Sequence, residues 1–176
     1  MRTSQLLTTG LAVLAAASPY PRQIANPTNF LLVTTSQCPS ANSSSTLPGV
    51  SATSLFDPNY QPNYLLRLID PGYGSLPRFN LTNGELASIA MGPHGVGTFV
   101  YSSTGNVTGG EELEFSRDVE PAGNLALKTG YLLTVGGEEE GWTVCNGQLD
   151  EEVIYWKGTD ASCTPTYIHA VQDAPY

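Results

Sequence analysis

The side chains that could take part in catalysis are few and scattered. The chain has two histidines. His94 lies in the glycine-rich segment 91–97, and His169 shares a predicted strand face with Tyr167 and Val171. We expect a solvated loop residue at His94 and a hydrogen-bonded histidine at the core edge at His169. A ribonuclease-like set could be assembled only from these two and Arg78, and the acidity of the chain opposes an RNA substrate.

Acidic side chains gather in three short runs. They are Glu111, Glu112 and Glu114, then Glu138 to Glu140, and then Asp150 to Glu152. A glycosidase holds two carboxylates on rigid elements about 5 Å or ~6.5–9.5 Å apart, whereas these runs adjoin glycine-rich turns. We therefore expect solvated hairpin tips. Neither a calcium-loop pattern nor a Gly-x-Ser-x-Gly elbow is present, so we assign no catalytic residue, no metal site and no cofactor.

Exposed aromatic rings offer a second kind of site, because sugars stack on aromatic faces. Trp142, Tyr155 and Trp156 are the candidate ligand-stacking residues. Successive strand residues point to opposite faces, so either Tyr155 or Trp156 could face solvent. The alternative is that both lie in core layers of the fold.

The N-terminus predicts export. Residues 1–17 combine Arg2, a short apolar stretch and an Ala-rich end, as in a secretory signal peptide. We expect a flexible leader over residues 18–28 and one domain over 29–176. Sequons at Asn42, Asn80 and Asn106 predict N-glycosylation on exposed loops. The expected location is extracellular or in a cell wall.

Charge and length limit the partners. The formal net charge is −9. Removal of the predicted signal peptide takes Arg2 away, so the net charge of residues 18–176 is −10. Such acidity repels phosphate backbones, so we expect no nucleic-acid partner. The chain has no apolar run of about 20 residues, so we expect no membrane partner. A monomer or weak oligomer is expected.

Three cysteines, Cys38, Cys145 and Cys163, are present. In an exported protein a pair is expected to oxidise. Cys145 precedes an Asn-Gly pair and Cys163 follows the next strand, which favours a Cys145–Cys163 disulfide. Pairing of Cys38 with either of them, or with a second chain, is the alternative.

The low charge content and the many Gly and Pro residues predict an all-β domain. Strands are expected at 29–35, 64–69, 97–102, 113–116, 152–157 and 166–171, with a long loop over 36–62. Residues 85–91 could form one short helix. Asn83-Gly84, Thr129-Gly130 and Asn146-Gly147 predict three tight hairpins. Their uneven spacing favours an antiparallel β-sandwich or irregular β-barrel, with a β-trefoil-like fold as the alternative.

The signal peptide, the Ser/Thr-rich start and the late run Gly141–Cys145 followed by Ile154–Trp156 resemble small secreted cell-wall proteins of filamentous fungi, of the phialide-associated type. The resemblance implies a nonenzymatic wall or matrix protein and transfers no catalytic residue. Expected partners are a cell-wall polysaccharide or other wall proteins. A carbohydrate-binding module is the first alternative function, and a small secreted hydrolase is the second.

Overall fold

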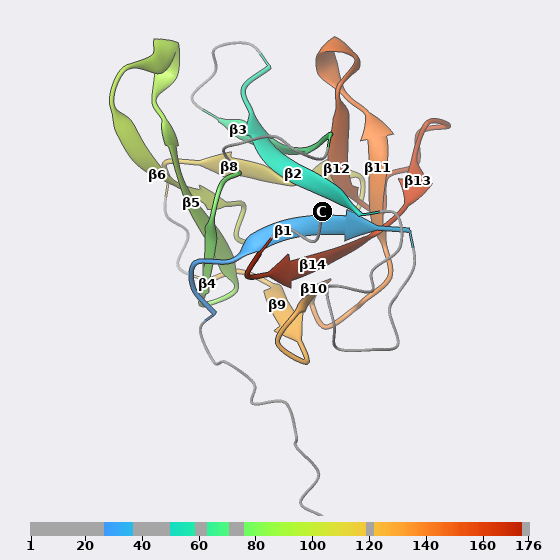
Figure 1. The fold of residues 1–176 in the computed structure, drawn as a ribbon. Helices are drawn as coiled ribbons and strands as arrows, with labels where there is room; N and C mark the ends of the chain where they lie inside the picture. Colours follow the sequence, from blue (N-terminus) through green and yellow to red (C-terminus); the bar gives the residue numbers. More distant parts are fainter. Residues whose placement is uncertain (1–26, 37–49, 59–62, 71–75, 119–121, 174–176) are drawn as a thin grey trace, which may run out of the picture.

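The computed structural model describes residues 27–36, 50–58, 63–70, 76–118 and 122–173, and these residues confirm the all-β prediction (Figure 1). The strands are β1 (Leu31–Thr35), β2 (Ser51–Phe56), β3 (Tyr64–Ile69), β4 (Phe79–Thr82), β5 (Glu85–Met91), β6 (Thr98–Ser103), β7 (Glu111–Glu112), β8 (Glu114–Ser116), β9 (Leu125–Lys128), β10 (Leu132–Val135), β11 (Trp142–Asn146), β12 (Glu152–Trp156), β13 (Thr164–Pro165) and β14 (Tyr167–Val171). Two 3₁₀ turns are η2 (Pro93–Gly95) and η3 (Gln148–Asp150). Within these ranges, no helix has the length and apolarity to cross a membrane.

The main sheet is antiparallel and bends back on itself. Its strand order is β4-β5-β6-β8-β3-β2-β1-β14-β10-β9. At the β4 end, Phe30 and Phe79 exchange two backbone hydrogen bonds of 3.1 and 2.8 Å, and the Leu81 amide donates to the carbonyl of Pro27 at 2.9 Å. Because residue 30 leads directly into β1, these bonds bring the two ends of the β4-to-β1 ladder together. The irregular barrel is therefore the architecture observed, nearly closed.

A second group of strands lies beside this ladder. β12 pairs with β3, β7 and β11, and β11 pairs in turn with β13. The register places Trp142 opposite Trp156. Sequence segments that are far apart, β3 and β12, thus share one ladder, which brings the turn after β11 beside Arg67.

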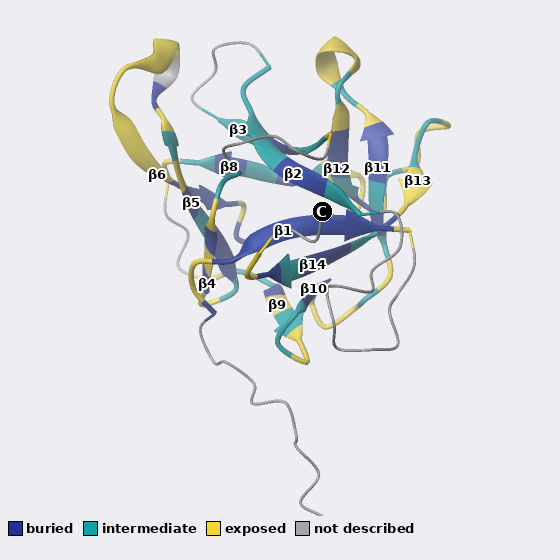
Figure 2. Cartoon of the chain, in the orientation of Figure 1, coloured by how far each residue is buried: buried dark blue, intermediate teal, exposed yellow. Residues whose placement is uncertain are grey.

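One apolar core fills the interior (Figure 2). Its largest fully buried side chains include Trp142, Tyr101, Phe30, Phe79 and Phe115. β1 is buried along its whole length because both of its faces are covered. Leu32 contributes to the main core, whereas Leu31 and Val33 form a smaller cluster with Val171.

The predicted hairpins form with different loops. β4 and β5 join through Asn83 and Gly84, whose φ angles are 51° and 81°, as a two-residue turn requires. The β9–β10 connection takes three residues, 129–131. The Asn146-Gly147 prediction was wrong in detail: Asn146 still pairs with Glu152, so the loop covers 147–151 and contains η3.

Two segments differ from the predictions. Residues 51–56, expected in the long loop, form β2 at the centre of the sheet, where Thr53 is buried and its hydroxyl donates to the Leu32 carbonyl at 2.8 Å. Residues 85–91, which could have been a short helix, form β5 because β4 and β6 pair with it on both sides. The rest of the predicted loop, 37–49, lies outside the described residues.

Candidate functional site

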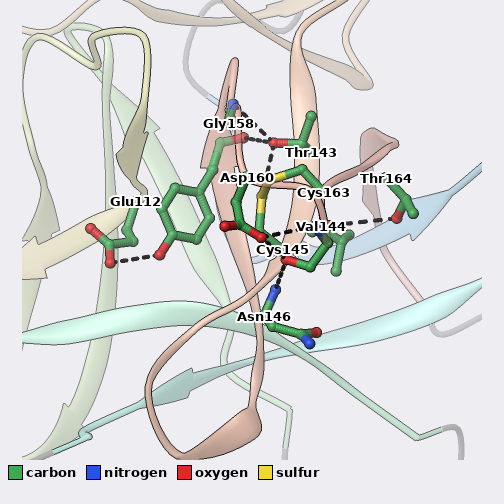
Figure 3. The surroundings of a disulfide bond; sticks show 11 residues. Glu112, Thr143, Val144, Cys145, Asn146, Gly158, Asp160, Cys163 and Thr164 are labelled. Atoms are coloured by element: carbon green, nitrogen blue, oxygen red, sulfur yellow. Dashed lines mark hydrogen bonds between the residues drawn. A yellow bond between two sulfur atoms is a disulfide. The ribbon is translucent and has the colours of Figure 1, made fainter.

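Cys145 and Cys163 lie at disulfide distance, with their sulfur atoms 2.03 Å apart (Figure 3). Gly158 packs directly against the pair. A Cβ at Gly158 would lie 2.7 Å from the Cys145 sulfur and 2.9 Å from the Cys163 sulfur. The disulfide therefore joins the β11–β12 hairpin to the loop before β13, and Gly158 leaves no space for a side chain beside it. Cys38, whose partner was left open, lies outside the described residues.

The tryptophans proposed as sugar-stacking residues are buried, which corrects that prediction. Trp142 is 0% exposed and Trp156 is 4% exposed. Their rings pack edge to face with centroids 5.0 Å apart, and the Trp142 indole nitrogen donates to the Leu133 carbonyl at 3.0 Å. Paired across β11 and β12, both rings belong to the core, the alternative considered from sequence.

Tyr155 is half-buried, and its hydroxyl is already engaged. It donates to the Glu112 carboxylate at 2.8 Å. Burial, together with this hydrogen bond to Glu112, raises the pKa of Tyr155 to about 12. The hydroxyl is therefore protonated at physiological pH and links β12 to β7.

The carboxylate runs are more strongly tied to the fold than expected. Glu114 accepts from the Asn63 amide, and Glu138 pairs with Lys157 at 2.6 Å. Glu139 pairs with Lys128. Because each partner comes from another strand or loop, these carboxylates brace neighbouring turns, and Glu111 remains exposed as predicted.

The two histidines occupy unrelated environments. His94 is exposed in the η2 turn, within the β5–β6 connection, and has a φ of 58°. His169 is 2% exposed in β14, stacked on Tyr131 with centroids 5.5 Å apart. Its Nε2 has no hydrogen-bond partner among the described residues. We expected a hydrogen-bonded histidine at the edge of the core, and His169 is instead fully buried. Burial lowers its pKa to about 4.

An acidic hollow of about 490 Å³ lies where β3 meets the turn before β12. Asp70, Asp150, Glu151 and Glu152 line it, with Arg67 among them. Arg67 pairs with Glu151 at 2.5 Å and lies over the Phe56 ring, 4.7 Å from its centroid. In the described part of the chain, no group of three or more His, Cys, Asp or Glu side chains is arranged to hold a metal ion.

The most exposed apolar feature is a projecting hairpin, which we call the arm: β5, β6 and the connection 92–97 (Figures 1 and 2). Five large hydrophobic side chains on it are exposed, and we call them the arm patch: Ile89, Met91, Val96, Phe99 and Val100. Val96 is 72% exposed and Ile89 is 66% exposed. In the described residues, the only other large hydrophobic side chain this exposed is Leu149, on η3.

Hydrogen bonding and close packing hold the arm in place. The hydroxyl of Tyr64, on β3, donates to the Met91 carbonyl at 2.6 Å. Phe99 closes the inside of the connection, since a Cβ at Gly92 would lie 2.4 Å from its ring. Ile89 lies opposite Val100 in the β5–β6 register, so these two share one face with Met91. The arm patch is thus presented on a braced hairpin.

Of the five described Lys and Arg side chains, the two without a carboxylate partner, Arg78 and Arg117, border the arm. Among the described residues, Arg67, Lys128 and Lys157 are ion-paired. Arg117 instead lies over the Phe99 ring, 4.8 Å from its centroid, and Arg78 donates to the carbonyls of Asn29 and Gln172. In the described structure, the positive charges beside the arm patch are therefore not ion-paired.

A groove of about 410 Å³ runs along the base of the arm. Ile89, Val100, Leu76 and Arg78 contribute to its lining, as does Asn80. Asn80 and Asn106, two of the predicted glycosylation sites, are exposed. Asn42 lies outside the described residues. Sequence patterns gave the sequons but not the arm patch, because alternating apolar residues in β5 and β6 indicate burial as readily as exposure.

Comparisons of the chain with protein-family models, curated proteins and solved structures found no match. What the protein does must therefore be inferred from its own residues.

Proposed function

We propose that this protein is an exported, nonenzymatic component of a cell wall or extracellular matrix, and that it associates with a wall protein through the arm. The observation that carries the proposal is the tip of the arm patch, where Met91, Val96 and Phe99 are exposed at the end of one braced hairpin. Contiguous exposed apolar side chains mark interaction surfaces in soluble proteins. The predicted signal peptide and the fungal wall-protein resemblance supply the setting.

The chemistry of the arm favours a protein partner over a polysaccharide. Val96 and Met91 give no flat aromatic face for a sugar ring, and Arg117 lies over the one aromatic ring of the arm patch, Phe99. The rings that could have done so, Trp142 and Trp156, are in the core. Branched and thioether side chains instead suit a protein surface that buries apolar area.

Charge defines the partner further. Arg117 and Arg78 border the arm patch without a carboxylate among the described residues. A matching surface would place Asp or Glu side chains around an apolar centre, because complementary charges at a rim guide association. The partner is thus a protein with an apolar patch that has an acidic rim.

Binding to fungal wall fragments tests this function. The purified protein is titrated onto intact walls, onto walls stripped of protein by protease, and onto insoluble chitin, β-glucan and cellulose. We expect saturable binding to intact walls alone, weakened by salt. The double variant Met91→Gln/Val96→Ser should bind about thirtyfold more weakly, since each of its two lost apolar contacts is worth roughly 1 kcal/mol.

Leu149→Asn is the matched control, because Leu149 is 70% exposed on a distant turn. This variant should bind walls as the parent does. Retained binding to stripped walls or to one pure polymer would contradict the protein-partner proposal and favour the carbohydrate-binding alternative, with the acidic hollow as its site. Equal binding by the arm double variant and the parent would also reject it.

A further inference from the structure

We propose that an N-linked glycan on Asn80 lies in the groove at the base of the arm and covers Ile89 and Val100. This inference rests on the export that the proposed function requires. It assigns to one sequon a structural role that the other described sequon, at Asn106, does not share.

The hydrogen bonding of Asn80 in the folded protein is compatible with a glycan. Its Oδ1 accepts a hydrogen bond from the backbone amide of Asn29 at 2.8 Å. N-glycosylation uses the other amide atom, Nδ2, so this hydrogen bond survives the modification. Asn80 is exposed and lines the groove. Because its Oδ1 is held towards Asn29, the direction of Nδ2, which carries the glycan, is fixed as well.

The strand register places the apolar side chains on the face that Asn80 occupies. Asn80 lies opposite Ala87, and directly opposed residues point to the same side of a sheet. Ile89 is two residues further along β5, so it shares this face, about 7 Å away, and Val100 lies opposite it. Ile89 is 66% exposed and Val100 is 58% exposed.

A glycan is a suitable cover for this groove. The first sugars present apolar C–H faces and acetamido methyl groups to Ile89, Val100 and Leu76, and hydroxyls to Arg78. In the transfer step, C1 of the first sugar forms a bond to Nδ2, its bond to a lipid pyrophosphate donor breaks, and Nδ2 loses one proton. The tip of the arm, with Val96, lies beyond the groove lining and stays available to the partner.

The test uses the full chain, expressed through the secretory pathway of a yeast with its own leader. Thr82→Val removes the Asn80 sequon but keeps Asn80, its bond to Asn29 and a β-branched residue in β4. Thr108→Val removes the Asn106 sequon as the matched control. Occupancy is read by mass spectrometry, apolar exposure by binding of an anilinonaphthalene dye, and stability by thermal unfolding.

We expect Asn80 to be occupied in the secreted parent. Thr82→Val should bind several-fold more dye and melt several degrees lower, whereas Thr108→Val should match the parent in both. In an Ile89→Ser/Val100→Ser background, removal of the Asn80 sequon should no longer change dye binding, because the covered side chains are absent.

Secreted protein with an empty Asn80 would overturn the inference, as would an occupied Asn80 whose removal changes neither dye binding nor melting. Neither result bears on wall binding, which is measured separately. Failure of the chain to leave the cell would instead reject the export on which both proposals depend.

Discussion

Within the described part of the chain, burial alone, and no charged neighbour, shifts the pKa of the His169 imidazole. Tyr131 stacks on it at 5.5 Å, and its ladder neighbours are Val33 on β1 and Leu132 on β10. Burial accordingly lowers its pKa to about 4, below the ordinary value of 6.5. Between these two values the unfolded chain binds the proton and the folded chain does not. The histidine therefore makes the fold less stable as the pH falls through that window.

The free energy of unfolding should follow this prediction. Between pH 7 and pH 4.5 the parent should lose about 2–3 kcal/mol more than His169→Gln, at ~1.4 kcal/mol per pKa unit. Urea unfolding at several pH values measures both curves, and only their slopes are compared, so any constant cost of the substitution cancels. Parallel curves would show that His169 does not titrate in this way.

At the scale of strands and turns, backbone contacts between loops fix the arm to the barrel. The β4–β5 turn packs against residues 123–125: the Gly123 amide donates to the Asn83 carbonyl at 2.8 Å, and the Leu125 amide donates to the Gly84 carbonyl at 3.0 Å. A Cβ at Gly123 would lie 2.1 Å from the Gly84 carbonyl oxygen and 2.7 Å from that of Gly105. Only glycine permits this approach.

Gly123→Ala should therefore destabilise the fold by about 1–3 kcal/mol, because the clashing atoms are backbone and have to move together. Gly109→Ala is the control, since its Cβ would lie 3.8 Å from Lys157, an ordinary contact. Chemical denaturation should give a clear loss for the first variant and little change for the second. A neutral Gly123→Ala would mean that the two turns separate readily.

Strands whose own residues favour β-structure could be predicted from the sequence. Strands that form only because adjacent strands pair with them could not. β1, β3, β12 and β14 are rich in β-branched and aromatic residues, and the sequence located them closely. β2 contains Ser51, Thr53 and Ser54, which resemble a loop, yet pairing with β1 and β3 buries Thr53. β5 contains helix-favouring Glu, Leu, Ala and Met, and two partner strands override that preference.

The candidate sites likewise include one that local sequence could predict and others that depend on strand pairing. A sequon is a local pattern, so Asn80 could be named from sequence. Whether an aromatic or aliphatic side chain faces solvent depends on which strands cover it. Trp142 and Trp156 face each other in the core only because β11 and β12 pair in one register, and Ile89 is exposed because no strand covers that face of the arm in the described structure.

At the scale of the whole molecule, the nearly closed barrel depends on a short seam. Phe30 and Phe79 exchange backbone hydrogen bonds, and the Leu81 amide reaches Pro27. Phe30 is 1% exposed, and its ring packs on Phe79 with centroids 6.4 Å apart. The seam thus combines backbone pairing with buried aromatic area, and without it β4, which pairs with β5 on one side, would have an unpaired outer edge.

Phe30→Ala should open this seam before the rest of the barrel unfolds. Phe115→Ala on β8 is the matched comparison, because Phe115 is 0% exposed and also packs on Phe79, at 5.8 Å, but makes no seam pairing. Both variants should lose about 3–5 kcal/mol of stability. Hydrogen exchange separates them: in Phe30→Ala the amides of Phe79 and Leu81 should exchange by local opening, well ahead of the β3 amides. In Phe115→Ala these amides should exchange together with β3, since the seam remains paired until global unfolding. If both variants give the same pattern, Phe30 adds only bulk to the core, and closure of the barrel must be maintained elsewhere in the sheet.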